Sequence, residues 1–141
     1  MRVLEGTQAH ILWTIEEETD AAQAELAAKL SADPVDILIM LGNDETEQAI
    51  DYFLSVGNPT DCLLYGIGRS EKAVYYLDNG MIQSLVVPNE FNMGYQSIAA
   101  MAEQINRTDA RIERHLVDFL IVNRENLYER DNQKVLFPIV Q

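Results

Sequence analysis

The sequence predicts an α/β fold: a doubly wound, mostly parallel sheet between two helical layers, that is, a three-layer α/β/α sandwich. Apolar runs of strand length alternate four times with stretches in which apolar residues recur at the helical period. The connectors between them are short and polar, which is typical of repeated strand–helix units with parallel strands. A chain of 141 residues has room for one such lobe.

Four apolar runs are expected to form the strands of this sheet. They are residues 9–15, 35–41, 61–67 and 82–87. The second run reads Val-Asp-Ile-Leu-Ile-Met-Leu and is apolar at almost every position. It therefore predicts a strand that is buried on both faces.

Helices are expected between and after these strands. Residues 20–30 follow a Thr19 cap, residues 45–56 follow the second strand, Ser70 caps a short helix, and residues 93–105 form the last one. The side chains expected to face inward are Ala22, Leu26, Leu30, Ala49, Ile50, Phe53, Leu54, Val74, Leu77, Tyr95, Ile98, Ala102 and Ile105.

The last part of the chain breaks this rhythm. Residues 116–122 are expected to pair with the sheet, and the polar stretch 123–133 has room for one helical turn. Residues 135–140 are strand-like, but Pro138 confines them to an edge. We therefore expect one lobe over residues 1–141, in which residues 123–141 form an extension with a terminal strand. Such an apolar end also predicts homodimerisation by strand addition or swapping.

Charge excludes several classes of partner. The net charge of −13, without any Lys/Arg cluster, argues against binding to nucleic acid or to anionic membranes. Cys62 is the single cysteine and lies in a strand-like run, so a small buried hydrophobe is expected rather than a reactive thiol. No apolar run reaches the length of a membrane-spanning helix.

Catalytic and metal signatures are absent from the sequence. There is no G-x-S-x-G, H-E-x-x-H, P-loop or G-x-G-x-x-G motif, so neither an enzyme nor a cofactor is expected. An enzyme using Asp44 or Glu90 as a base would also need an activated nucleophile. Glu16-Glu17-Glu18 is better explained as a solvated loop than as a cation site, and His10 and His115 lack companions at metal spacing.

The candidate binding site lies where the strands end. The turn Gly42-Asn43-Asp44-Glu45 follows the second strand, and in a parallel sheet ligands bind at the carboxyl ends of the strands. The residues expected to line this rim are Asn43, Asp44, Gly68, Asn89, Glu90 and Phe91, with Glu16 and Glu17 nearby. The carboxylates disfavour anions, so a neutral polyhydroxylated or cationic solute is expected.

Two local alternatives stand beside this interpretation. Asn43 or Asp44 would act only as the N-cap of the helix that follows, and Phe91 would only pack as a staple against the next helix.

Four motifs in this order resemble a known family. They are the segments 35–45, 63–68 and 77–82, and the stretch Val-Val-Pro-Asn-Glu-Phe-Asn-Met-Gly-Tyr at 86–95. Over residues 9–122 the chain resembles the C-terminal lobe of a type I periplasmic-binding-protein-like domain. The resemblance implies two lobes that close on a small solute, and Asn43 matches a position that often hydrogen-bonds the sugar. Gly68 stands where sugar binders usually carry Asp, and Pro88 stands where many carry Gln.

The resemblance implies the small-molecule-binding lobe of an ABC-transporter or sensory receptor. Its partners would be a missing N-terminal lobe and a membrane permease or sensor, and it would lie outside the cytoplasm, periplasmic or membrane-anchored. The alternative is the effector-binding lobe of a cytoplasmic, lactose-repressor-type transcription regulator. In either case the chain is expected to be a fragment of a longer two-lobe protein.

Overall fold

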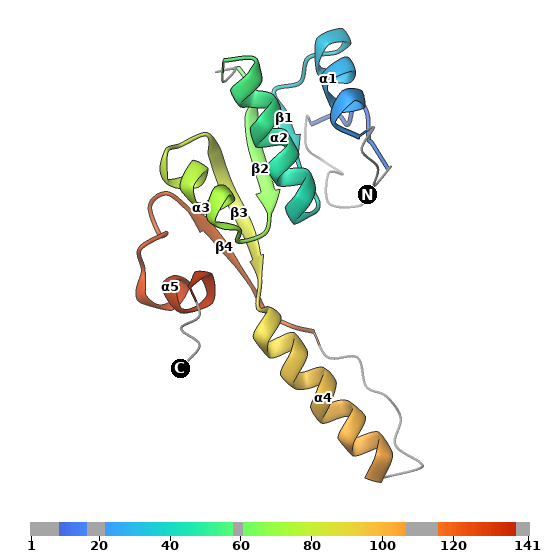
Figure 1. Cartoon of the computed structure of the whole chain (residues 1–141), viewed down its shortest axis with the longest axis vertical. Coiled ribbons are helices and arrows are strands. Elements are labelled where there is room, and N and C mark those ends of the chain that lie inside the picture. Colours follow the sequence, from blue (N-terminus) through green and yellow to red (C-terminus); the bar gives the residue numbers. More distant parts are fainter. Residues whose placement is uncertain (1–8, 17–21, 58–60, 107–115, 138–141) are drawn as a thin grey trace.

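The computed structural model describes residues 9–16, 22–57, 61–106 and 116–137. In chain order the elements are α1 (Ala22–Ala32), β1 (Ile37–Ile39), α2 (Asn43–Ser55), β2 (Leu63–Ile67), α3 (Glu71–Asp78), β3 (Ile82–Pro88), α4 (Glu90–Asn106), β4 (Phe119–Asn123) and α5 (Arg130–Leu136) (Figure 1). The predicted α/β class is confirmed, and so are the expected helices between the strands.

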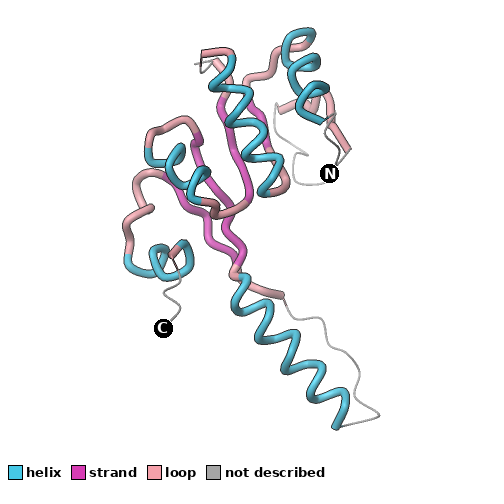
Figure 2. The backbone as a smooth tube through the Cα atoms, in the orientation of Figure 1, coloured by secondary structure: helices cyan, strands magenta, loops and turns pink. Residues whose placement is uncertain are grey.

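The strands form one mostly parallel sheet in the order β1-β2-β3-β4. The first three strands are parallel, and β4 runs antiparallel to β3 (Figure 2). The pairing of β4 confirms that the strand predicted near residues 116–122 joins the sheet.

The core lies on one face of this sheet. The order of the strands in the sheet is the same as their order in the sequence. Right-handed connections between such strands place their helices on the same side of the sheet. Accordingly, α2 and α3 both lie in front of the sheet in Figure 1. Their apolar side chains meet the alternate strand residues that face them. The buried residues of this helix–sheet contact are Ala49, Ile50 and Phe53 from α2, Ala73, Val74 and Leu77 from α3, and Leu38, Leu64, Ile82, Leu85, Val87 and Val122 from the strands.

The opposite face of the sheet is open in the part of the chain that the structure describes. Leu38 is 5% exposed, whereas its neighbours Ile37 and Ile39 are 51% and 63% exposed. The expectation that this strand is buried on both faces is therefore wrong, because no described helix covers the second face. The second helical layer of the predicted sandwich is not among the described residues.

α4 projects away from the sheet instead of packing on it (Figures 1 and 2). Tyr95, Ile98, Ala102 and Ile105, which were expected to face inward, are all exposed. The helical spacing of these residues is real, but no surface formed by the described residues packs against them. Leu54 on α2 is likewise 46% exposed, although Ala49, Ile50 and Phe53 on the same helix are buried as expected.

Two predicted strands are wrong. Residues 9–16 form no strand, although Trp13 and Ile15 pack against the core and the Trp13 indole N–H donates to the Asp33 carbonyl at 3.2 Å. The aromatic and branched residues of this segment therefore serve core packing without strand pairing. Residues 135 and 136 belong to α5, because Leu136 is buried and the Asn132 amide one turn earlier donates to the Asn126 carbonyl at 2.9 Å. The Thr19 cap and residues 138–140 lie outside the described residues.

Two further features bear on function classes. Within the described ranges, no helix is both long and apolar enough to cross a bilayer. Cys62 is half-buried against the core, and burial together with the nearby charge of Asp36 raises the pKa of its thiol. A raised pKa lowers the thiolate fraction, which agrees with a structural role for this cysteine.

Candidate functional site

The carboxyl ends of β1, β2 and β3 enclose one side of an open cleft of about 530 Å³. It lies at the edge of the sheet where ligands bind in parallel α/β folds. Its lining residues come from the first turn of α2, the end of β2, the β2–α3 turn, the end of β3 and the start of α4; they are Asn43, Ile67, Gly68, Arg69, Ser70, Pro88 and Glu90.

Asn43 lies in this cleft and is not needed to cap α2. The N-cap residue is Gly42, and no side chain accepts a hydrogen bond at this helix start. Capping by Asn43 or Asp44, the local alternative, is therefore wrong. The Asn43 amide faces the backbone of Gly68 so closely that a Cβ added there would lie 2.3 Å from Asn43 Oδ1. Gly68 also has a φ of +130°, which side-chain-bearing residues rarely adopt.

Thr46 holds the two turns of the cleft together. Its hydroxyl oxygen lies 2.6 Å from the Gly42 carbonyl and 3.0 Å from the Ile67 carbonyl, and it accepts the Ile67 backbone N–H at 3.2 Å. Thr46 is fully buried. A Cβ on Gly66 would lie 2.6 Å from Thr46 Cγ2, so the glycine permits this approach. The sequence analysis missed Thr46, since a threonine within a first helical turn gives no signal of a contact 21 residues away.

We expect Thr46→Val to destabilise the protein by about 1–3 kcal/mol, because the isosteric side chain leaves the buried Ile67 N–H without its acceptor. Urea unfolding followed by circular dichroism measures this change. Ser31→Ala is the control: Ser31 Oγ donates to a carbonyl one turn earlier at an exposed position, so its loss should change stability by less than about 0.5 kcal/mol. Equal effects of the two substitutions would contradict the role given to Thr46.

Arg69 and Glu90 form an ion pair across the cleft. Arg69 Nε and Nη2 donate to the same oxygen, Glu90 Oε2, at 3.1 and 2.8 Å. The pair joins the β2–α3 turn to the start of α4. It leaves the Glu90 carboxylate neutralised, whereas the sequence analysis treated it as an uncompensated charge and missed Arg69 altogether.

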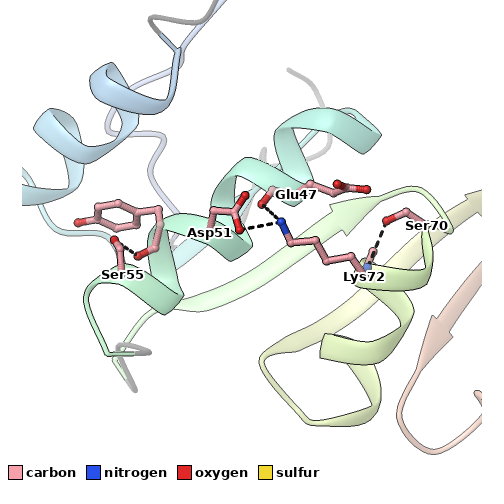
Figure 3. Close-up of polar contacts among 7 residues, drawn as sticks. Glu47, Asp51, Ser55, Ser70 and Lys72 are labelled. Carbon is pink, nitrogen blue, oxygen red and sulfur yellow. Dashed lines mark hydrogen bonds and ion pairs between the residues drawn. The ribbon is translucent and has the colours of Figure 1, made fainter.

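Polar contacts join the start of α3, which borders the cleft, to the middle of α2 (Figure 3). Lys72 Nζ lies 2.7 Å from Asp51 Oδ1 and 3.5 Å from the Glu47 carbonyl, so it joins the two helices. Ser70 caps α3 as predicted, since its Oγ accepts the Ala73 N–H at 3.2 Å. The lining turn 68–70 is therefore anchored at its helical end.

The structure brings some of the predicted rim residues together. Asn43, Gly68 and Glu90 line the cleft, whereas Asp44, Asn89 and Phe91 are not among its lining residues. Asn89 caps α4 through Oδ1, which accepts the Asn92 N–H at 3.0 Å. Phe91 is 84% exposed, so it does not pack as a staple against this helix either.

The remaining candidate of the described residues, Glu16, is not among the lining residues of the cleft. Glu16 is exposed, and Glu17 lies outside the described residues. Within the described ranges no group of three or more His, Cys, Asp or Glu residues is arranged to hold a metal ion. A ligand role for any of the predicted rim residues stays a prediction.

Comparison with known proteins supports the fold. Residues 2–109 match the family model described as the periplasmic binding protein domain. No curated protein matches the sequence. An ABC transporter solute-binding protein from Agrobacterium vitis, bound with α-D-tagatopyranose, is similar with a TM-score of 0.75 at 15% identity, over 90% of this chain and 43% of that one.

Two further structures are similar in the same way. GanP, a glucose-galactose binding protein from Geobacillus stearothermophilus, has a TM-score of 0.68 at 19% identity, over 79% of this chain and 40% of that one. A carbohydrate transporter solute-binding protein from Agrobacterium radiobacter, in complex with D-arabinose, has a TM-score of 0.69 at 15% identity, over 81% and 39%. The chain thus spans about two fifths of the length of these relatives.

Proposed function

The chain belongs to the periplasmic binding protein domain family, as its motifs predicted, and from this premise we propose that it is one lobe of a receptor that binds a small polar solute. The observation that carries the proposal is the cleft at the carboxyl ends of β1, β2 and β3. There the Asn43 amide, which capping does not use, lies beside Gly68 and the Arg69–Glu90 pair. The proposal includes no catalytic step: among the described lining residues no nucleophile is paired with a base.

A neutral polyhydroxylated solute fits the chemistry of this cleft best. An amide both donates and accepts hydrogen bonds, as a sugar hydroxyl does. The single cation and the single anion of the lining are paired with each other, so a charged ligand would have to separate them. The names of three similar structures, which mention glucose and galactose, D-arabinose and tagatopyranose, support the same class.

The rest of the assembly follows from this proposal. A second lobe would close the cleft, because an open half-cleft does not enclose a small ligand enough for tight binding. A receptor of this kind lies outside the cytoplasm and passes its solute or its signal to a membrane permease or sensor. No feature of the described residues favours the transcription-regulator alternative.

Calorimetry on the full two-lobe protein with a panel of sugars, polyols and amines tests the proposal. We expect a neutral polyol or sugar to bind, and Asn43→Ala to weaken its binding roughly 10- to 100-fold through the lost amide hydrogen bonds. Gln83→Ala is the matched control, since this exposed amide lies at the amino-terminal end of β3. Wild-type affinity in Asn43→Ala would contradict the site, and binding of amines alone would contradict the solute class.

A further inference from the structure

α4 carries an apolar surface that nothing in the described chain covers. Five residues, spaced alternately by four and three, lie along one side of the helix; this α4 stripe consists of Phe91, Tyr95, Ile98, Ala102 and Ile105. Its four large side chains are 67–84% exposed. A contiguous exposed patch of this kind marks an interaction surface on an otherwise soluble protein.

The polar side of α4 is the better covered one. Asn92, Gln96 and Ala100 are only partly exposed, and Oε1 of Gln96 is a buried oxygen for which no hydrogen-bond partner is present among the described residues. The helix carries only two charged residues, Glu90 and Glu103, in a chain whose net charge is −13. α4 therefore turns its apolar side to solvent, the reverse of a solvated surface helix.

The open sheet face is the second uncovered apolar surface. The strand register aligns Ile39 with Tyr65 and Val86 with Ile121, so their side chains share this face. The open sheet face consists of the apolar residues Ile37, Ile39, Leu63, Tyr65, Ile67, Val86, Pro88, Phe119 and Ile121, together with the polar residues Ser84 and Asn123. None of these residues is charged. An apolar helix side and an apolar sheet face are the two surfaces that pack against each other in layered α/β folds.

The α4 stripe does not reach the sheet face of its own chain. Three residues lie between β2 and α3, but Asn89 alone separates β3 from α4. The Asn89 side chain and carbonyl accept the N–H groups of Asn92 and Met93, each at 3.0 Å, and the Arg69–Glu90 pair holds the first helical residue. These contacts fix α4 as a continuation beyond the end of β3 (Figure 2). Folding back would break them.

We propose that α4 of one copy packs its stripe on the open sheet face of a second copy of this chain, in a reciprocal twofold dimer. This proposal is independent of the solute-binding function. A helix of 17 residues is about 25 Å long and covers a strip about 10 Å wide. Two reciprocal contacts then bury on the order of 1,000 Å² in total, which reaches the lower bound for a specific interface.

Sedimentation equilibrium of residues 1–141 at about 0.15 M salt tests the dimer, since this ionic strength screens the acidic surfaces. We expect a species of twice the chain mass. Ile98→Glu in the α4 stripe and Ile121→Glu on the open sheet face should each weaken its Kd roughly 30-fold or more, as a charge placed in an apolar interface core does. Met93→Glu is the matched control: this methionine is 46% exposed on the same helix but outside the stripe, so its variant should dimerise like wild type.

Cross-linking distinguishes a second copy from a helix that folds back. A variant that carries Cys62→Ser, Ile98→Cys and Ile121→Cys is treated with a short bismaleimide and analysed by denaturing gel electrophoresis. We expect cross-linked dimers, and also cross-links between the two single-cysteine chains when these are mixed. Monomers with internal cross-links, a strict monomer by sedimentation, or dimers that Ile98→Glu leaves intact would each overturn the proposal. Circular dichroism of every variant verifies folding, which the exposed positions of Ile98 and Ile121 favour.

Discussion

Phe53→Ala is expected to remove a large share of the stability of this protein. Phe53 is 1% exposed and is the largest fully buried side chain of the described residues. Truncating a buried phenylalanine removes about 3–5 kcal/mol of stability. A small domain has only about 5–15 kcal/mol in total, and this one builds its core on a single face of the sheet. The loss should therefore be a large part of the available stability, and the unfolding midpoint should fall to a clearly lower urea concentration.

Leu54→Ala is the matched control for this prediction. Leu54 is the next residue on α2, and it is 46% exposed. Its truncation should change the free energy of unfolding by less than about 1 kcal/mol. Urea titrations of both variants, followed by circular dichroism and by tryptophan fluorescence, measure the two changes. A Phe53→Ala protein that unfolds at the same urea concentration as Leu54→Ala would show that the core described around α2 is not the one that stabilises the domain.

The sequence pattern predicted those elements whose burial is decided by nearest neighbours. The run at 35–41, the capped helix after Ser70 and the strand at 82–87 are all present, because each has an apolar side that meets another local element. The same pattern was wrong where burial depends on a surface that the described chain does not supply. The helical spacing of α4 is real, but its stripe faces solvent, and β1 is covered only on the side of Leu38.

The candidate site was predictable in place but not in composition. Short polar turns after parallel strands placed Asn43, Gly68 and Glu90 correctly at one edge of the sheet. Arg69 and Thr46 were missed, because their roles arise from contacts between residues 21 positions apart, which no local pattern encodes. Asn89 was assigned to the rim, yet its side chain caps α4, an alternative that the sequence analysis weighed for Asn43 instead.

Gly68→Ala should abolish solute binding by the full two-lobe receptor, or weaken it by roughly 100-fold or more, because two effects combine at this position. The new Cβ would lie 2.3 Å from Asn43 Oδ1 and 3.0 Å from Asn43 Cγ, so the amide must leave its place in the cleft. The φ of +130° at this residue also disfavours any side chain, and relaxing that strain shifts the β2–α3 turn that carries Arg69.

Gly57→Ala separates these two effects. Gly57 has a φ of +84°, so an alanine there is strained as well, but no atom of the described residues lies within 4 Å of the added Cβ. We expect both variants to lose about 1–3 kcal/mol of stability, since each places a side chain in a disfavoured backbone conformation. Calorimetry should then show wild-type affinity for Gly57→Ala and lost affinity for Gly68→Ala. If Gly68→Ala binds the solute as tightly as wild type while its stability falls as expected, the Asn43 amide is not a ligand contact, and the recognition groups lie on the other lobe.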